Sequence, residues 1–278
     1  MPAVTSYDRR LAYYACAFAR TIFHHHRPGR TAYVSIGLMT TCDANEYSLE
    51  TLSEATHYNE WIYELMRPYL GRCVLELGTG IGNHTPNLLR DDRTVVSIDI
   101  NEDLIRGHRE RVPANPRLTV LCTSIQDLAG NPHYERAFDS VVSSNVLEHI
   151  PDGIDRDVVR GMYRVLRQGG YAVHWVPACQ MLFGSLDRSF GHHRRYNRTS
   201  AKALLAHAGF EIVSCKYWNL PGFFSWWLSG RVLNVQSISR SSALTFDRFV
   251  VPIIRRVEPW IWRPFGQSLL LVARKQTH

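Results

Sequence analysis

Between residues 72 and 176 the chain alternates short apolar runs, rich in β-branched residues, with stretches whose apolar positions recur at helical spacing. This alternation is typical of a parallel β-sheet covered by helices on both faces. The pattern predicts strands at residues 72–77, 94–99, 118–122, 140–143 and 171–176, and helices at residues 57–70, 83–89, 101–111, 154–166 and 200–208. Two further apolar runs, at residues 211–218 and 267–273, complete a predicted α/β fold with a seven-stranded, doubly wound, mostly parallel sheet.

A long segment, residues 219–266, separates the last two predicted strands. Hairpin loops normally contain only a few residues, so a connection of this length needs structure of its own. Its aromatic side chains are Phe223, Phe224, Trp226, Trp227, Phe246, Phe249, Trp260, Trp262 and Phe265. We expect a mostly helical insertion that closes over an acceptor site or forms a subunit contact, although an ordinary core beneath a lid would also account for any single tryptophan.

The first 38 residues do not continue the sheet pattern, whereas residues 39–218 lead into the predicted core and residues 267–278 form its last strand and tail. We interpret residues 1–38 as an extension, helical or disordered, that the core does not require. The alternative is a helix at residues 8–20 that packs on a second subunit of a homodimer. The extension contains His24, His25 and His26, and such a run seldom binds a metal without further ligands.

The composition is that of a folded globular protein, with 45% hydrophobic and 21% charged residues. Six cysteines without a C-x-x-C pair indicate reduced thiols in a cytoplasmic protein, and we expect no transmembrane segment and no signal peptide. The net charge of +7 is uneven, because residues 183–278 carry 14 basic and 4 acidic side chains. A basic C-terminal third favours an anionic acceptor, a membrane surface or nucleic acid, but a solvated basic surface explains it equally well.

The motif with the clearest chemistry is V-L-E-L-G-T-G-I-G at residues 74–82, an apolar strand that ends in Glu76 and a glycine-rich turn before a helix. Side chains at Gly78 and Gly80 would occupy the space of a ligand held against this turn. Asp99 closes the next strand, where a carboxylate can accept hydrogen bonds from both hydroxyls of a ribose. A dinucleotide-binding G-x-G-x-x-G would need glycine at position 83, which is Asn83.

The next motif is F-D-S-V-V-S-S-N-V-L-E-H-I-P-D at residues 138–152, where the fourth strand leads into a loop. Together with the glycine turn and the acid after the second strand, it resembles the class I S-adenosylmethionine-dependent methyltransferases over about residues 58–275. The resemblance implies a Rossmann-like fold, S-adenosylmethionine as the cofactor, and contacts to it from Tyr58, Glu76, Gly78, Gly80, Gly82, Asp99, Ile100, Ser124, Ile125, Asn145 and Val146.

One position departs from the family pattern. After the third strand the family often places an acid beside the adenine, whereas this chain reads C-T-S-I-Q-D, with Ser124 at that place. Either Ser124 makes a weaker contact or Asp127 replaces it.

On the acceptor side, a methyltransferase must hold its acceptor in line with the methyl group, and a base helps when the nucleophile is a hydroxyl or an acidic carbon. His149, in the loop after the fourth strand, is either this base or a residue that orients the loop. His192 and Tyr196, in the segment F-G-H-H-R-R-Y-N-R at residues 190–198, are further acceptor-side candidates. The arginines of this segment either grip an anionic acceptor or pair with acidic residues of the domain. No cluster at metal-ligand spacing is evident, and the sequence predicts no metal.

These observations predict an S-adenosylmethionine-dependent methyltransferase acting on oxygen, nitrogen or carbon of a small, hydrophobic or anionic acceptor of the kind found in secondary metabolism. The alternatives are a methyltransferase of a lipid-linked saccharide or of RNA, and a non-catalytic cofactor-binding or scaffold protein. Nucleic acid is disfavoured because the chain has S-N-V-L, not N-P-P-Y, after the fourth strand. A peripheral membrane contact through residues 223–228 is a further hypothesis.

Overall fold

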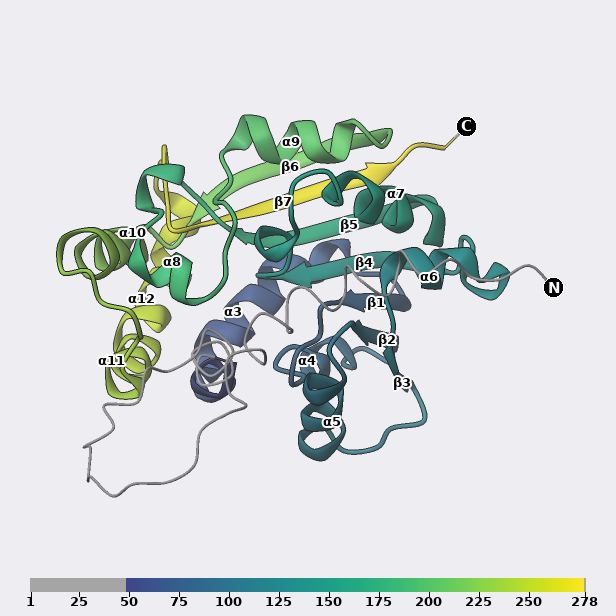
Figure 1. The fold of residues 1–278 in the computed structure, drawn as a ribbon, viewed down its shortest axis with the longest axis horizontal. Helices are drawn as coiled ribbons and strands as arrows, with labels where there is room; N and C mark the ends of the chain where they lie inside the picture. The colour runs from purple at the N-terminus through teal and green to yellow at the C-terminus, as the bar shows by residue number, and fades with distance from the viewer. Residues whose placement is uncertain (1–48, 278) are drawn as a thin grey trace, which may run out of the picture.

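The computed structural model describes residues 49–277, so the predicted extension at residues 1–38 lies outside the described residues. A seven-stranded sheet runs through the molecule (Figure 1), in the order β3-β2-β1-β4-β5-β7-β6. Its strands are β1 (Cys73–Leu77), β2 (Thr94–Asp99), β3 (Leu118–Cys122), β4 (Phe138–Ser144), β5 (Leu166–Pro177), β6 (Phe210–Trp218) and β7 (Ser268–Lys275). Neighbouring strands are parallel except that β7 runs antiparallel to both β5 and β6. The predicted Rossmann-like, mostly parallel sheet is confirmed.

Helices cover both faces of this sheet. Successive residues of a strand point to opposite faces, so each inner strand contributes apolar side chains to two cores. In β4, Val141 belongs to one buried cluster and Val142 to the other. The first cluster lies under α6 (Ile125–Gly130), α7 (Asp155–Val165) and α9 (Arg198–Ala206). The second lies under α3 (Thr56–Met66), α4 (Thr85–Leu88) and α12 (Val251–Val257). The predicted doubly wound arrangement therefore has an apolar core on each side of the sheet.

The remaining elements are short, apart from α5 (Glu102–Arg111), which packs beside β2 and β3. Asn101 begins α5, since its side chain accepts hydrogen bonds from the backbone N–H groups of Asp103 and Leu104. Single 3-10 turns occupy Arg67–Tyr69, Pro132–Tyr134, Leu147–His149, Gln180–Leu182 and Glu258–Trp260. Helix α8 (Ser185–Ser189) follows the fourth of these turns.

Several elements differ from the sequence predictions, among them α3, which ends at Met66 where a helix to residue 70 was predicted, and β4, which spans Phe138–Ser144 where residues 140–143 were predicted. Helices α6 and α8 were not predicted, α4 is shorter than the predicted residues 83–89, and β5 begins at Leu166, not at residue 171. Helices of one or two turns present too few apolar positions for a period to be recognised. Gly169 and Gly170 interrupt the apolar pattern at the start of β5, and Gly169 has a φ of +75°, so the sequence predicted the strand only from residue 171.

Residues 219–266 form the predicted helical insertion, with α10 (Leu220–Trp226), α11 (Arg240–Thr245) and α12. Wider π-helical turns continue α10 over Trp227–Val232 and join α11 to α12 over Phe246–Val250. The insertion is tied to the sheet domain, because the Asp247 carboxylate accepts hydrogen bonds from the backbone N–H of Tyr58 (2.7 Å) and of His57 (3.3 Å) at the start of α3. The division into a core, an insertion and a tail at residues 218 and 266 stays a prediction.

Candidate functional site

The glycine-rich turn after β1 is held against the next strand by its own backbone. The N–H groups of Gly78 and Thr79 both donate to the carbonyl of Ile98 in β2, at 2.8 and 3.0 Å. Gly78, Gly80 and Gly82 all have positive φ, at +67°, +55° and +85°. Only glycine adopts this region without strain, so the turn requires these residues even before a ligand is considered.

Contacts inside the protein also explain two of the three glycines. A Cβ at Gly78 would lie 2.5 Å from a methyl group of Val146, and one at Gly82 would lie 2.5 Å from Val112. A Cβ at Gly80 would meet only ordinary contacts, 3.7 Å from Leu49. The contact with Val146 is therefore a reason for glycine at position 78 that does not depend on a ligand, and the contact with Val112 is the corresponding reason at position 82.

Glu76 lies beneath the turn and is buried in a cluster of hydroxyl groups. Its Oε2 atom accepts hydrogen bonds from Ser97 (2.6 Å), Thr85 (2.6 Å) and Thr79 (3.0 Å). Burial raises the pKa of the Glu76 carboxyl, and the three hydroxyl groups oppose that shift. These bonds connect β1, β2, the turn and α4, so Glu76 fixes the shape of the turn.

Asp99 joins the glycine turn to the end of β2. One carboxylate oxygen accepts from the N–H of Gly80 at 3.0 Å, and the other accepts from the N–H of Asn101 at 2.9 Å. Burial raises the pKa of the Asp99 carboxyl, while these backbone donors lower it. Each carboxylate oxygen can accept more than one hydrogen bond, so both retain capacity for a ligand hydroxyl. The next side chain, Ile100, is 75% exposed and offers an apolar surface beside this acid.

Ser124 and Asp127, the two candidates for an adenine contact, are bonded to each other. The Ser124 hydroxyl donates to the Asp127 carboxylate at 2.7 Å and accepts from the Asp127 N–H at 3.0 Å, which caps the start of α6. Ile125 is 2% exposed and packs in the core. Both polar side chains take part in this cap, so the cap does not indicate which of the two would contact the adenine.

The loop after β4 approaches the glycine turn from the neighbouring strand. Asn145 takes a left-handed conformation, with φ of +53°, and its N–H donates to the carbonyl of Trp175 at 2.8 Å. Val146 follows and contacts Gly78, as described above. Tyr58 of α3 is part of the same wall, since its hydroxyl accepts from the Trp175 indole N–H at 3.3 Å.

Among the buried polar atoms without a partner within residues 49–277 are Oδ1 of Asn83 and Oγ of Ser144. Asn83 follows the glycine turn, and Ser144 ends β4. A buried polar atom without a hydrogen bond is costly, so both atoms call for a polar ligand. Together with the acid at Asp99 and the exposed Ile100, they fit a ligand with a ribose, an apolar ring and a charged amino-acid end, which is the chemistry of S-adenosylmethionine.

The acceptor-side candidates gather around the 3-10 turn Leu147–His149. The rings of His149 and His192 meet edge to face, with centroids 4.8 Å apart. Tyr196 is 3% exposed and donates its hydroxyl hydrogen to the carbonyl of Leu147 at 3.0 Å, so it supports the turn from inside. Burial lowers the pKa of His149 to about 3 and raises the pKa of the Tyr196 hydroxyl.

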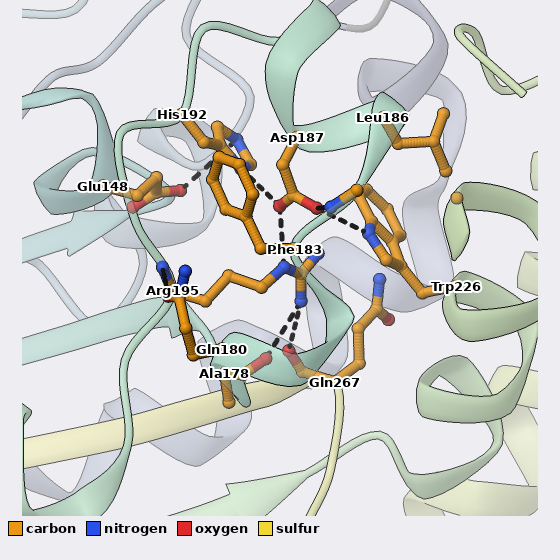
Figure 2. A network of polar contacts seen from close by, with 12 residues as sticks. Glu148, Ala178, Gln180, Phe183, Leu186, Asp187, His192, Arg195, Trp226 and Gln267 are labelled. Atoms are coloured by element: carbon orange, nitrogen blue, oxygen red, sulfur yellow. Dashed lines mark hydrogen bonds and ion pairs between the residues drawn. The ribbon is translucent and has the colours of Figure 1, made fainter. Parts of the chain in front are cut away.

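A second polar cluster surrounds Asp187, which lies in α8 and is fully buried (Figure 2). Its carboxylate accepts from Nε of Arg195 (2.7 Å), the indole N–H of Trp226 (3.2 Å) and the N–H of Gly184 (3.0 Å), and it contacts Nδ1 of His192 (2.9 Å). This cluster joins α8, the segment before α9 and α10. Asp187 was not predicted from the sequence, because no motif marks it, and Trp226 was named there only as one of the aromatic residues of the insertion.

Both arginines of the segment before α9 are paired with acidic residues. Of the two predicted uses for these arginines, this arrangement matches pairing within the domain, not binding of an anionic acceptor. Arg195 binds Asp187, and Arg194 contacts Asp152 at 2.8 Å and Asp155 at 3.0 Å. Within the described residues, Nη2 of Arg195 is buried and has no hydrogen-bond partner. The segment therefore offers little free positive charge to an anionic acceptor.

Comparison with known proteins agrees with this geometry. A family model described as methyltransferase domain matches residues 74–170. A protein of Mycolicibacterium smegmatis described as a probable S-adenosylmethionine-dependent methyltransferase is 28% identical over 173 residues, which cover 60% of this chain and 64% of that protein. A protein of Mycobacterium tuberculosis with the same description is 26% identical over 216 residues, covering 74% of this chain and 75% of its own length.

The chain thus matches just under two thirds of the first relative's length. Among solved structures, an S-adenosylmethionine-dependent methyltransferase from Archaeoglobus fulgidus superimposes with a TM-score of 0.53 at 19% identity, covering 78% of this chain and 94% of that one. At that identity the likeness shows the fold.

Proposed function

We propose, from the premise that this chain is an S-adenosylmethionine-dependent methyltransferase with its methyltransferase domain at residues 74–170, that it methylates a small, hydrophobic acceptor. The observation that carries the cofactor assignment is the hydrogen bond between Gly80 and Asp99, which joins the turn after β1 to the acid after β2. The cofactor supplies an activated methyl group on a sulfonium, and the residues of the chain bind it, orient the acceptor and exclude water.

We assign the ribose to Asp99, the ring face to Ile100, and the amino-acid end to the region of Asn83 and Ser144. The glycine turn and Val146 then form the floor of the cofactor site. Glu76 contributes by holding the turn through three hydroxyl groups.

This assignment is tested by calorimetric titration of the purified chain with S-adenosylhomocysteine. The wild-type chain should bind, and Asp99→Asn should bind about 10- to 100-fold more weakly, because a charge-assisted hydrogen bond contributes about 1.5–3 kcal/mol. Asp103→Asn is the matched control, since Asp103 lies four residues away and is exposed. Absence of heat with the wild-type chain, or equal losses in both variants, would contradict the assignment.

On the acceptor side we favour a hydrophobic acceptor over an anionic one. The arginines that would recognise an anion are paired with Asp152, Asp155 and Asp187. His149 is a weak proton acceptor near neutral pH, because burial lowers its pKa to about 3. We therefore assign His149 a role in shaping the site, not in removing a proton.

The exposed surface of the insertion favours a lipid-linked acceptor as the second candidate. Phe249, Ile253, Val257 and Trp260 recur at intervals of four, four and three residues along one helical run, and all are exposed, with Trp260 at 88%. Exposed apolar surface of this extent marks an interaction site. Arg248 and Arg256 are exposed on the same segment, whereas Arg255 pairs with Glu64 and Arg263 packs over Trp218. Exposed apolar and basic side chains together fit an anionic membrane surface. Within residues 49–277, no helix has the length and apolarity needed to cross a bilayer.

Co-sedimentation with vesicles tests this second candidate. Vesicles of phosphatidylglycerol and phosphatidylcholine should bind the chain, and pure phosphatidylcholine should bind it less. Replacing Trp260 and Trp262 by Ser should remove most of the binding, whereas Val213→Ser, an exposed apolar residue on the edge strand β6, should not. If vesicles do not bind and light scattering shows a dimer that the tryptophan variant lacks, the surface joins two copies of the chain instead.

A further inference from the structure

We propose that Glu148, His149 and His192 bind a divalent transition-metal ion of the Zn²⁺ class on the acceptor side of the site. Glu148 and His149 belong to the 3-10 turn after β4, and His192 lies between α8 and α9. One potential ligand atom from each residue lies within 4.8 Å of the others. The role of the ion rests on the proposed methyl transfer, whereas its binding does not.

The unpaired carboxylate of Glu148 is the strongest observation for this site. The side chain is fully buried, and neither oxygen has a hydrogen-bond partner within the described residues. A buried carboxylate without a hydrogen-bond partner is unfavourable, and a bound cation would remove that cost.

The ring of His192 is oriented as a metal ligand. Its Nδ1 atom lies 2.9 Å from Oδ1 of Asp187, whose carboxylate is fixed by Arg195 and Trp226 (Figure 2). A carboxylate at this distance keeps the proton on Nδ1 and leaves the lone pair on Nε2, which lies 4.0 Å from Oε1 of Glu148. That distance is too long for a hydrogen bond. A carboxylate behind a histidine is the usual support for a metal-binding imidazole.

His149 completes the set, because its ring meets the ring of His192 edge to face, with centroids 4.8 Å apart. Two atoms that are each about 2.1 Å from one tetrahedral ion lie roughly 3.4 Å apart. Ligand atoms within 4.8 Å of one another therefore need to move together by roughly 1 Å on binding, which side-chain rotation can supply.

The ligand set indicates both the kind of ion and its use. Two imidazoles and one carboxylate suit Zn²⁺, Mn²⁺ or Fe²⁺, and three protein ligands leave at least one position open, as in catalytic zinc sites. A hydroxyl or carboxylate oxygen of the acceptor can take the open position. An ion there would lower the pKa of an acceptor hydroxyl, the task for which His149 alone is poorly suited.

The binding test uses the full chain, stripped with a chelator and without any methyl donor. Titration with Zn²⁺ should show about one equivalent bound per chain, and Co²⁺ should give visible absorption bands that Zn²⁺ abolishes. The same titration is repeated on a chain with His24, His25 and His26 replaced by Gln, because those residues form the other histidine cluster of the sequence. Loss of the bound ion in that chain, or no stoichiometric uptake by the wild type, would overturn the proposal.

Variants then identify the ligands. Glu148→Gln and His192→Gln should each weaken Zn²⁺ binding at least tenfold, and Asp187→Asn should weaken it 10- to 100-fold by removing the carboxylate that supports His192. His193→Gln is the matched control, because its side chain is the exposed neighbour of His192. Equal losses in the control and the ligand variants would refute the site. The Co²⁺ spectrum of the wild type remains decisive if a variant does not fold, and calorimetry with S-adenosylhomocysteine reports separately on the cofactor site.

Discussion

Replacing Gly78 by Ala tests whether the chain itself, apart from any bound cofactor, requires glycine in the turn after β1. Gly78 has a φ of +67°, and a Cβ there would lie 2.5 and 2.8 Å from the two methyl carbons of Val146. The left-handed conformation costs a non-glycine residue about 1–2 kcal/mol, and forcing a methyl group into a packed contact adds about 1–3 kcal/mol. Gly78→Ala should therefore lower the free energy of unfolding by about 2–5 kcal/mol.

Two companion variants separate these contributions. Gly153 has a φ of +91°, but nothing among the described residues lies within 4 Å of a Cβ placed there, so Gly153→Ala carries the backbone cost alone. Val146→Ala removes the methyl groups that the new Cβ would meet. Combining Gly78→Ala with Val146→Ala should leave a chain about 1–3 kcal/mol more stable than the sum of the single effects predicts.

The assay is urea denaturation without cofactor, followed by circular dichroism and tryptophan fluorescence. The difference between Gly78→Ala and Gly153→Ala measures the clash, and the double-mutant cycle locates it at Val146. Equal destabilisation by the two glycine variants, together with an additive cycle, would refute the clash with Val146 and leave the positive φ and a ligand as the reasons for Gly78.

Two further predictions concern stability. Asp247→Ala should destabilise the chain by about 1–2 kcal/mol in thermal or urea unfolding, because Asp247 caps the first turn of α3, whereas Asp103→Ala on the exposed first turn of α5 should have a smaller effect. Burial lowers the pKa of His174 to about 3 from an ordinary value of 6.5, so its stabilising effect is complete above about pH 6.5 and is lost as the pH falls toward 3. At pH 5 this loss is about 2 kcal/mol. The free energy of unfolding should therefore fall by about 2 kcal/mol less between pH 7.5 and pH 5 in His174→Gln than in the wild-type chain. An equal fall in both chains would contradict this prediction.

The sheet was predictable because its inner strands are buried on both faces. Such strands are continuous apolar runs, and the inner strands β1 and β2 therefore lie within one residue of their predicted positions. The edge strand β3 was predicted as accurately, although its residues are half-buried or exposed. Helices α6 and α8 were not predictable in the same way. Each depends on a local cap, by Ser124 in α6 and by the Asp187 carboxylate at the Gly184 N–H in α8, and on packing that no short stretch of sequence encodes.

The same distinction divides the candidate site. The proposed cofactor side consists of contiguous motifs at the carboxyl ends of β1, β2 and β4, so the sequence could supply candidates for it. The acceptor side depends on how the segments around Asp187 fold. His192 and Arg195 are only five and eight residues from Asp187, but Trp226 is 39 residues away, in α10. No motif in the sequence indicates that Trp226 meets Asp187.

The three buried carboxylates near this edge of the sheet are satisfied to very different degrees. Glu76 accepts three hydroxyl hydrogen bonds, and Asp187 accepts from an arginine, an indole and a backbone amide. Both serve the fold, since removing either would leave its donors unpaired. Glu148 is as deeply buried but has no hydrogen-bond partner in the described part of the chain. Glu148 therefore differs from the other two acids, and an ion held between its carboxylate and the rings of His149 and His192 would supply the partner that it lacks among residues 49–277.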